Sequence, residues 1–319
     1  TFGIIALVYT QLIPSIDMDR EVCKQSALYR GTLPDGSLTA QSKELISLKC
    51  KTKKICVTTN NIFQGKGECE NTFGEEFSTY RIKEKDADQQ IKMLLAREMA
   101  DCWDMLGRGN FAIFGREMRT DNSIGAIAVV CSRIHFDKTI TGTEEGQLKI
   151  KEIQGFNQYL LSRKVPNHEI SYWDFLRNAY DGETMAILSG PMVKGNEDGV
   201  ANFLNEKLQI TDTKAIVFME VRPTLAGAMI GAPIGGTIGA IAGAKVGGFT
   251  GFFMGLGGGS ALGWKAGDVV HVGGLRADGL FSDGTSAAGT FLTDYNLKGF
   301  KEIIPKLPES SRWWKNAWD

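Results

Sequence analysis

Histidine is scarce in this chain, and the motifs that usually accompany catalysis or cofactor binding are missing. Only three histidines occur, His135, His168 and His271, and they lie far apart in the sequence. No P-loop, HExxH, GxSxG or EF-hand pattern is present. We therefore interpret each histidine as a structural or surface imidazole and expect no metal, no cofactor and no enzymatic activity.

An excess of positive charge is also missing. The chain has 36 Lys and Arg against 37 Asp and Glu, a formal net charge of −1 and a pI near 6.3. A nucleic-acid-binding domain normally carries a basic footprint. The charge balance therefore argues against a nucleic-acid partner.

One long stretch has almost no charge at all, because Lys245 is the only charged residue between Pro223 and Trp264. Glycine recurs there at every fourth position, with small or apolar residues between, in a pattern that lets helix backbones approach closely. In water each interior glycine costs a helix about 1 kcal/mol relative to alanine. The segment resembles glycine-zipper (GxxxG-repeat) membrane and assembly proteins, on these residues: Gly227, Gly231, Gly235, Gly239, Gly243, Gly247, Gly251, Gly255, Gly259, Gly263 and Gly267.

The length of this stretch favours a bilayer. A spanning helix needs about 20 apolar residues, and segments 224–244 and 246–264 contain 21 and 19 residues. We expect a helical hairpin over 223–267 that turns at Lys245, with Trp264 at the membrane interface.

The glycine period also bears on assembly. Four residues turn a helix by about 400°, so the glycine stripe drifts by roughly 40° per step. A stripe this broad suits a helix with two neighbours, as in a ring or a filament. The alternative is a monomeric hairpin that packs on itself.

All six cysteines lie within the first 131 residues, and no two of them form a CxxC motif. Their even number predicts three disulfides formed in an oxidising compartment, with the pairing left open. Buried free thiols in a cytosolic protein are the alternative. The residues concerned are Cys23, Cys50, Cys56, Cys69, Cys102 and Cys131.

Apolar periodicity and turn residues divide the chain into five parts. We expect an apolar N-terminal helix or anchor at 1–14, a cysteine-rich α+β ectodomain at 15–222, the hairpin at 223–267, strands that complete the ectodomain at 268–304, and a tail at 305–319. Helices are predicted at 86–106, 147–163 and 199–208, and a short helix is predicted after Ser171. Strands are predicted after Cys56 and at 124–136, 185–188, 215–221, 269–272 and 290–292.

The residues around the cysteines carry a second resemblance. The motifs at Cys23, Cys50 to Cys56, Cys102 and Cys131 are similar to those of uncharacterised envelope proteins of small-genome archaea. This resemblance implies an exported ectodomain that is attached to a membrane. It brings no activity and no catalytic residues.

These patterns together predict a self-assembling structural protein of the cell envelope, a subunit of a ring, tube or filament with its ectodomain outside the cytoplasm. The expected partners are copies of the chain and a lipid bilayer, which the tail would contact through Trp313, Trp314 and Trp318. Packing of these tryptophans in the core or at a subunit contact is equally compatible. The alternatives in function are a pore-forming or membrane-perturbing protein that uses the same hairpin, and a membrane-anchored envelope enzyme without a recognisable site.

Overall fold

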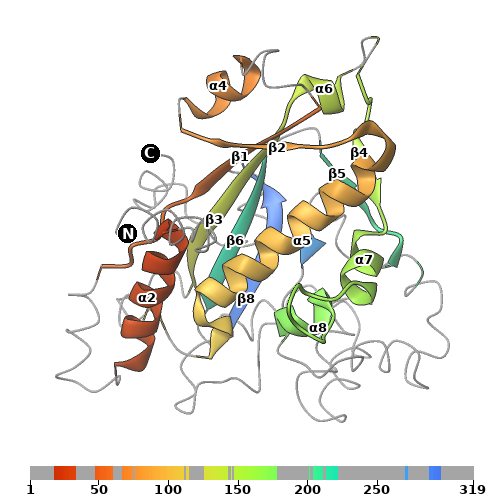
Figure 1. Ribbon diagram of the computed structural model, residues 1–319. Coiled ribbons are helices and arrows are strands. Elements are labelled where there is room, and N and C mark those ends of the chain that lie inside the picture. Colours follow the sequence, from red (N-terminus) through yellow and green to blue (C-terminus); the bar gives the residue numbers. More distant parts are fainter. Residues whose placement is uncertain are drawn as a thin grey trace, which may run out of the picture.

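The computed structural model describes residues 18–33, 47–59, 67–74, 76–110, 113–114, 126–142, 145, 147–177, 201, 204–210, 213–221, 270–271 and 287–295. These residues form a mixed α/β structure with a six-stranded sheet, a two-stranded sheet and packed helices (Figure 1). The predicted N-terminal helix at 1–14, strand at 185–188, hairpin at 223–267 and tail at 305–319 lie outside the described residues.

The large sheet has the strand order β2-β1-β3-β6-β8-β7. β1 is parallel to β2 and to β3, whereas the pairs β3–β6, β6–β8 and β8–β7 are antiparallel. Residues on both sides of the glycine-rich segment therefore belong to one sheet. The strands are Lys53–Thr58 (β1), Ser78–Arg81 (β2), Ala126–Phe136 (β3), Lys214–Val221 (β6), Val270–His271 (β7) and Ala287–Asp294 (β8).

Helix α5, Ala87–Met105, lies across the strands on one face of this sheet (Figure 1). Its apolar residues recur every three or four positions, so that Ile91, Leu95 and Met99 share one fully buried side. Trp103 follows on the same side and contacts Phe218 of β6, with ring centroids 5.9 Å apart. The helix predicted at 86–106 is confirmed.

Shorter helices surround α5. Helix α2, Met18–Thr32, packs against α5, as do α7, Phe156–Ser162, and α8, Tyr172–Arg177. The short helix predicted after Ser171 is confirmed as α8, and Ser171 caps it, because Asp174 donates its backbone N–H to the Ser171 hydroxyl at 3.0 Å. Among the described residues, the other short helices are α4, Gly67–Phe73, α6, Lys138–Thr141, and the 3-10 turns η1, Glu84–Asp86, and η2, Gly107–Gly109.

The alternation of side chains along β1 separates the two faces of the sheet. Ile55 and Val57 enter the same core as α5, whereas Cys56 lies between them and bonds to Cys69 of α4. Helix α4 therefore lies on the face opposite to α5. Both faces of β6 are buried, as a continuous apolar strand requires, because Val217 and Phe218 are each 0% exposed.

Two predicted helices differ from the structure. Residues 147–163 contain strand β4, Glu152–Gln154, followed by α7, and residues 199–208 end in strand β5, Lys207–Gln209. Gly155 separates β4 from α7 with φ of +67°, a conformation that glycine adopts without strain. Ile153 and Leu208 pair across the small sheet and are both buried, which fixes the extended conformation.

The strands predicted after Cys56 and at 124–136, 215–221, 269–272 and 290–292 are confirmed in type, with shifted ends. Among the described residues, no helix has both the length and the apolar character needed to cross a bilayer.

Leu95→Ala should lower the free energy of unfolding by about 3 kcal/mol, because it leaves a cavity beneath α5. Met93 is 44% exposed on the same helix, so Met93→Ala should change stability by less than about 0.5 kcal/mol. Urea unfolding followed by circular dichroism measures both. Equal effects of the two substitutions would contradict the packing of α5 described here.

Candidate functional site

All six cysteines form disulfides, so the prediction of three bridges is confirmed. Cys23–Cys50 joins α2 to the residues before β1, Cys56–Cys69 joins β1 to α4, and Cys102–Cys131 joins α5 to β3. The bridges close stretches of 27, 13 and 29 residues. Bonds of this kind persist in oxidising compartments.

The bridges also exclude one possible nucleophile. Cys102 and Cys131 could each have supplied a thiolate beside His135, but they are bonded to one another. A disulfide sulfur has no proton to give to a base and is not the nucleophile of such a pair. His135 moreover lies one strand position from Ile134, which faces α5, and so points to the other face of the sheet.

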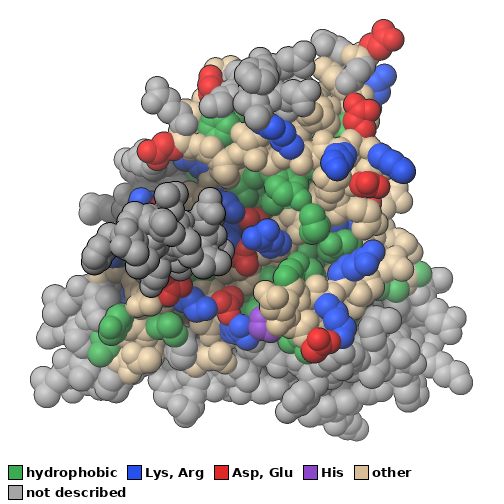
Figure 2. All heavy atoms as spheres, viewed as in Figure 1, with side chains coloured by type: hydrophobic (Ala, Val, Ile, Leu, Met, Phe, Trp, Pro, Cys, Tyr) green, Lys and Arg blue, Asp and Glu red, His purple; other side chains and the backbone are tan. Residues whose placement is uncertain are grey.

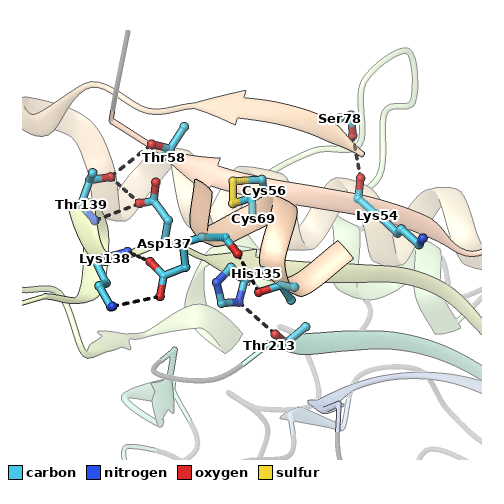
Figure 3. Close-up of a disulfide and its surroundings, with 12 residues drawn as sticks. Lys54, Cys56, Thr58, Cys69, Ser78, His135, Asp137, Lys138, Thr139 and Thr213 are labelled. Atoms are coloured by element: carbon cyan, nitrogen blue, oxygen red, sulfur yellow. Dashed lines mark hydrogen bonds and ion pairs between the residues drawn. A yellow bond between two sulfur atoms is a disulfide. The ribbon is translucent and has the colours of Figure 1, made fainter. Parts of the chain in front are cut away.

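His135 occupies a corner formed by β3, α4 and the residue before β6 (Figure 3). Its Nδ1 lies 3.0 Å from the Thr213 hydroxyl, and its ring meets the ring of Phe73 edge-on at 6.1 Å between centroids. Among the described residues, the buried Nε2 has no hydrogen-bond partner. Burial lowers the pKa of His135, and the carboxylates of Glu68 and Asp137 oppose this only in part.

The rest of this corner ties α4 and α6 to the sheet. Lys138 donates its backbone N–H to Glu68 at 2.8 Å, and Asp137 caps α6 by accepting the N–H of Thr139 at 3.0 Å. Thr58 of β1 contacts the Thr139 hydroxyl at 3.2 Å, as Figure 3 shows. Within the described part of the chain no group of three or more His, Cys, Asp and Glu side chains could hold a metal. The described hydrogen bonds of this corner therefore join α4 and α6 to the sheet.

Arg133 holds the same face together through its guanidinium. Its Cζ lies 5.2 Å from the ring centre of Phe73 and 4.0 Å from that of Tyr295. A cation over an aromatic face is attracted by the ring quadrupole. Arg133 thus connects β3 to α4 and to the residue that follows β8.

A second polar cluster lies on the α5 face and centres on Glu98, which is 2% exposed. Its carboxylate accepts hydrogen bonds from Arg20 of α2, from Lys53 of β1 at 2.9 Å and from Ser132 of β3 at 2.6 Å. Burial raises the pKa of Glu98, but the two cations and the hydrogen bonds outweigh it, and the net shift is downward. Glu98 is therefore ionised at neutral pH and joins four elements.

The same row of contacts continues along α5 toward its C-terminal end. Arg20 also pairs with Asp101, while Lys24 of α2 lies 2.7 Å from Asp104. Arg108 bonds to Asp104 from the other side at 2.8 Å. The basic residues of α2 are therefore directed toward α5 and into the domain.

Of the sequence-predicted site residues, the structure places the six cysteines. The eleven zipper glycines, Lys245, Trp264, Trp313, Trp314 and Trp318 lie outside the described residues. Sequence reasoning missed Glu98. A signal was present, because Glu98 lies three or four residues from Leu94 and Leu95 on the apolar side of its helix, where an unpaired carboxylate would be costly.

Comparison of the chain with protein-family models, with curated proteins and with solved structures gives no match.

Glu98→Gln should lower the free energy of unfolding at pH 7 by about 2 to 3 kcal/mol, because it removes a charge that hydrogen bonds to cations. The folded pKa is depressed, so this contribution is present above the unfolded value near 4.5 and disappears as the pH falls through the folded value. The stability difference between wild type and variant should therefore narrow below pH 4.5 in urea titrations.

Glu169→Gln is the matched control, since Glu169 pairs with Lys164 at 2.8 Å but its side chain is 95% exposed. It should change stability far less than Glu98→Gln, because solvent screens an exposed ion pair. A constant difference between wild type and Glu98→Gln from neutral to acid pH would contradict the role of Glu98.

Thiol titration of the unfolded, non-reduced protein should find no reactive thiol, and non-reducing peptide mapping should find the pairs Cys23–Cys50, Cys56–Cys69 and Cys102–Cys131. Replacing Cys102 and Cys131 together with alanine should cost about 3 kcal/mol, since the bridge constrains the unfolded chain. Any other pairing would contradict the arrangement of α2, α4 and α5.

Proposed function

We propose that this chain is a self-assembling structural subunit of a cell envelope, in a ring, tube or filament. Its disulfide-bonded domain lies outside the cytoplasm, and its glycine-rich segment at 224–267 makes the contacts between copies in or against a bilayer. The observation that carries this proposal is the run of eleven glycines at a spacing of four.

The three disulfides support an exported location for the domain. The bridges join residues 13 to 29 positions apart in the sequence, and all six cysteines except Cys50 are at least 95% buried. Reducing compartments keep most thiols unpaired. A domain fastened in this way suits an extracytoplasmic surface.

The attachment of the glycine-rich segment supports a role in assembly. β6 ends at Val221 and β7 begins at Val270, and both strands pair with β8. Val270 and Ile216 both pair with Leu292 of β8, so they lie at the same level of the sheet. The end of β6, Val221, is therefore five residues along the strands from Val270, the start of β7, and two strands away from it. Strand dimensions place them roughly 20 Å apart.

The two helices of a packed hairpin lie 8 to 10 Å apart. Residues 222–223 and 268–269 are long enough to cover the remaining distance between the ends of such a hairpin and the two strands. Because the sheet would hold both ends of such a hairpin, the domain could not rotate freely about it. A fixed orientation between domain and hairpin is what a regular assembly of identical subunits requires.

If the chain assembles as proposed, it should form large particles in mild detergent. Gly239→Leu and Gly251→Leu should each abolish these particles, because a leucine on the glycine stripe separates the helix backbones. Ile241→Leu is the matched control, since it lies between two stripe glycines and keeps its size. Sedimentation and electron microscopy compare the particle mass of the variants with that of the wild type. Circular dichroism checks that each variant is folded.

Unchanged particle size in the glycine variants would contradict the proposal. If the wild type released dye from liposomes and the glycine variants did not, the alternative function of a pore-forming protein would be favoured instead.

A further inference from the structure

Two consecutive lysines of β1 lie on opposite faces of the sheet and differ in their partners. Lys53 pairs with Glu98 at 2.9 Å on the α5 side, where Lys and Arg side chains lie among Asp and Glu side chains (Figure 2). Lys54 donates to the backbone carbonyl of Phe73 at 3.1 Å, and no described carboxylate pairs with it. Because an ammonium group has three N–H donors, Lys54 keeps two donors and a full positive charge for another partner.

A second cation, Arg133 of β3, lies beside Lys54 in the register of the two strands. Both side chains are half-buried on the face that α4 covers, and both meet Phe73, the last residue of α4. Neighbouring strands are about 4.8 Å apart, so two positive charges extend from adjacent positions toward the same residue. Charges of like sign at short range repel one another. This arrangement therefore gains stability when an anion binds between the two cations.

Aromatic rings, and no described carboxylate, hold the guanidinium of Arg133. Its Cζ lies 5.2 Å from the ring centre of Phe73 and 4.0 Å from that of Tyr295. Among the described residues the guanidinium has no hydrogen bond or ion pair, and its Nε is buried without a partner. The N–H groups of arginine form a planar fork that matches the oxygens of phosphate and carboxylate groups. Contacts with the ring faces leave the edge of this fork available to such an anion.

The acidic side chains at the neighbouring corner have other donors. Glu68 accepts the backbone N–H of Lys138 at 2.8 Å and lies 3.9 Å from the ammonium of the same residue. Asp137 accepts the backbone N–H of Thr139 at 3.0 Å. Neither carboxylate forms an ion pair with the two cations described above. Within the described part of the chain, their charges are therefore not compensated by direct pairing.

We propose that Lys54 and Arg133 together bind the phosphate group of a phosphate monoester, beside the rings of Phe73 and Tyr295. Such a group carries a charge of about −1.5 to −2 at pH 7 and three acceptor oxygens, which matches two cations on adjacent strands. A carboxylate carries a single charge and would leave one of the cations uncompensated. Arginine supplies bidentate hydrogen bonds in a site of this kind, and lysine supplies a point charge.

The phosphate monoester belongs either to a soluble molecule or to the headgroup of phosphatidic acid, which present the same chemistry to the two cations. The site does not depend on the proposed assembly, because its residues lie in β1, α4 and β3 and directly after β8. The variant Gly239→Leu should therefore bind phosphate as the wild type does.

Titration calorimetry of the full-length protein with inorganic phosphate, at constant ionic strength, tests the site. Lys54→Gln and Arg133→Gln should each weaken binding about tenfold or more, which is the effect of losing one hydrogen bond between charged groups. Lys51→Gln is the matched control, since it removes the same charge just before β1 from a side chain that is 75% exposed and pairs with Asp19. It should leave the affinity unchanged. Circular dichroism checks each fold, and Lys54→Gln alone decides the test if Arg133→Gln does not fold.

Vesicles of phosphatidylcholine, with and without phosphatidic acid, distinguish the two sources of the phosphate. Cosedimentation that requires phosphatidic acid, is lost in Lys54→Gln and is competed by inorganic phosphate would identify the headgroup. Binding of inorganic phosphate without binding of these vesicles would identify a soluble ester. Three results would overturn the proposal. They are the absence of binding of both probes to the wild type, an equal loss of binding in Lys51→Gln, and binding of acetate as tight as that of phosphate.

Discussion

The packing of α5 on the central strands is the contact on which the other described elements depend. Leu95, Met99 and Trp103 fill the space between this helix and the sheet, and none of them is exposed. Helices α2, α7 and α8 all contact α5, so their positions follow from its own. The Cys102–Cys131 bridge fixes the helix to β3 near the end of this contact. The hydrophobic effect supplies the attraction, and the bridge joins the two elements covalently.

Glu98 adds directional hydrogen bonds to the packing of α5 on the sheet, whereas apolar contacts have no directional preference. Its carboxylate needs donors from α2, β1 and β3 at the same time. Burial of the charge is costly, and partners of opposite charge offset this cost only in good geometry. The cluster therefore links the positions of α2, β1 and β3 to that of α5.

Local patterns in the sequence predicted α5, the central strands and the existence of three disulfides, because periodicity and cysteine number depend on nearby residues or on composition. They did not predict the pairing of the cysteines, which follows from where α2, α4 and α5 pack. Residues 150–156 have helical apolar spacing, yet β4 forms because a partner strand arrives some fifty residues later. The role of Glu98 likewise required Arg20 and Lys53, at separations of 78 and 45 residues.

The strands on either side of the glycine-rich segment would respond differently to mechanical load. β6 is paired with β8 over eight residues and also pairs with β3, so tension along its axis loads two rows of hydrogen bonds in shear. In the described chain β7 pairs at two positions. Among the described pairings, tension applied through residues 222–269 meets eight paired positions with β8 and eight with β3 on the β6 side, against two on the β7 side. The described pairings therefore hold β6 more firmly than β7.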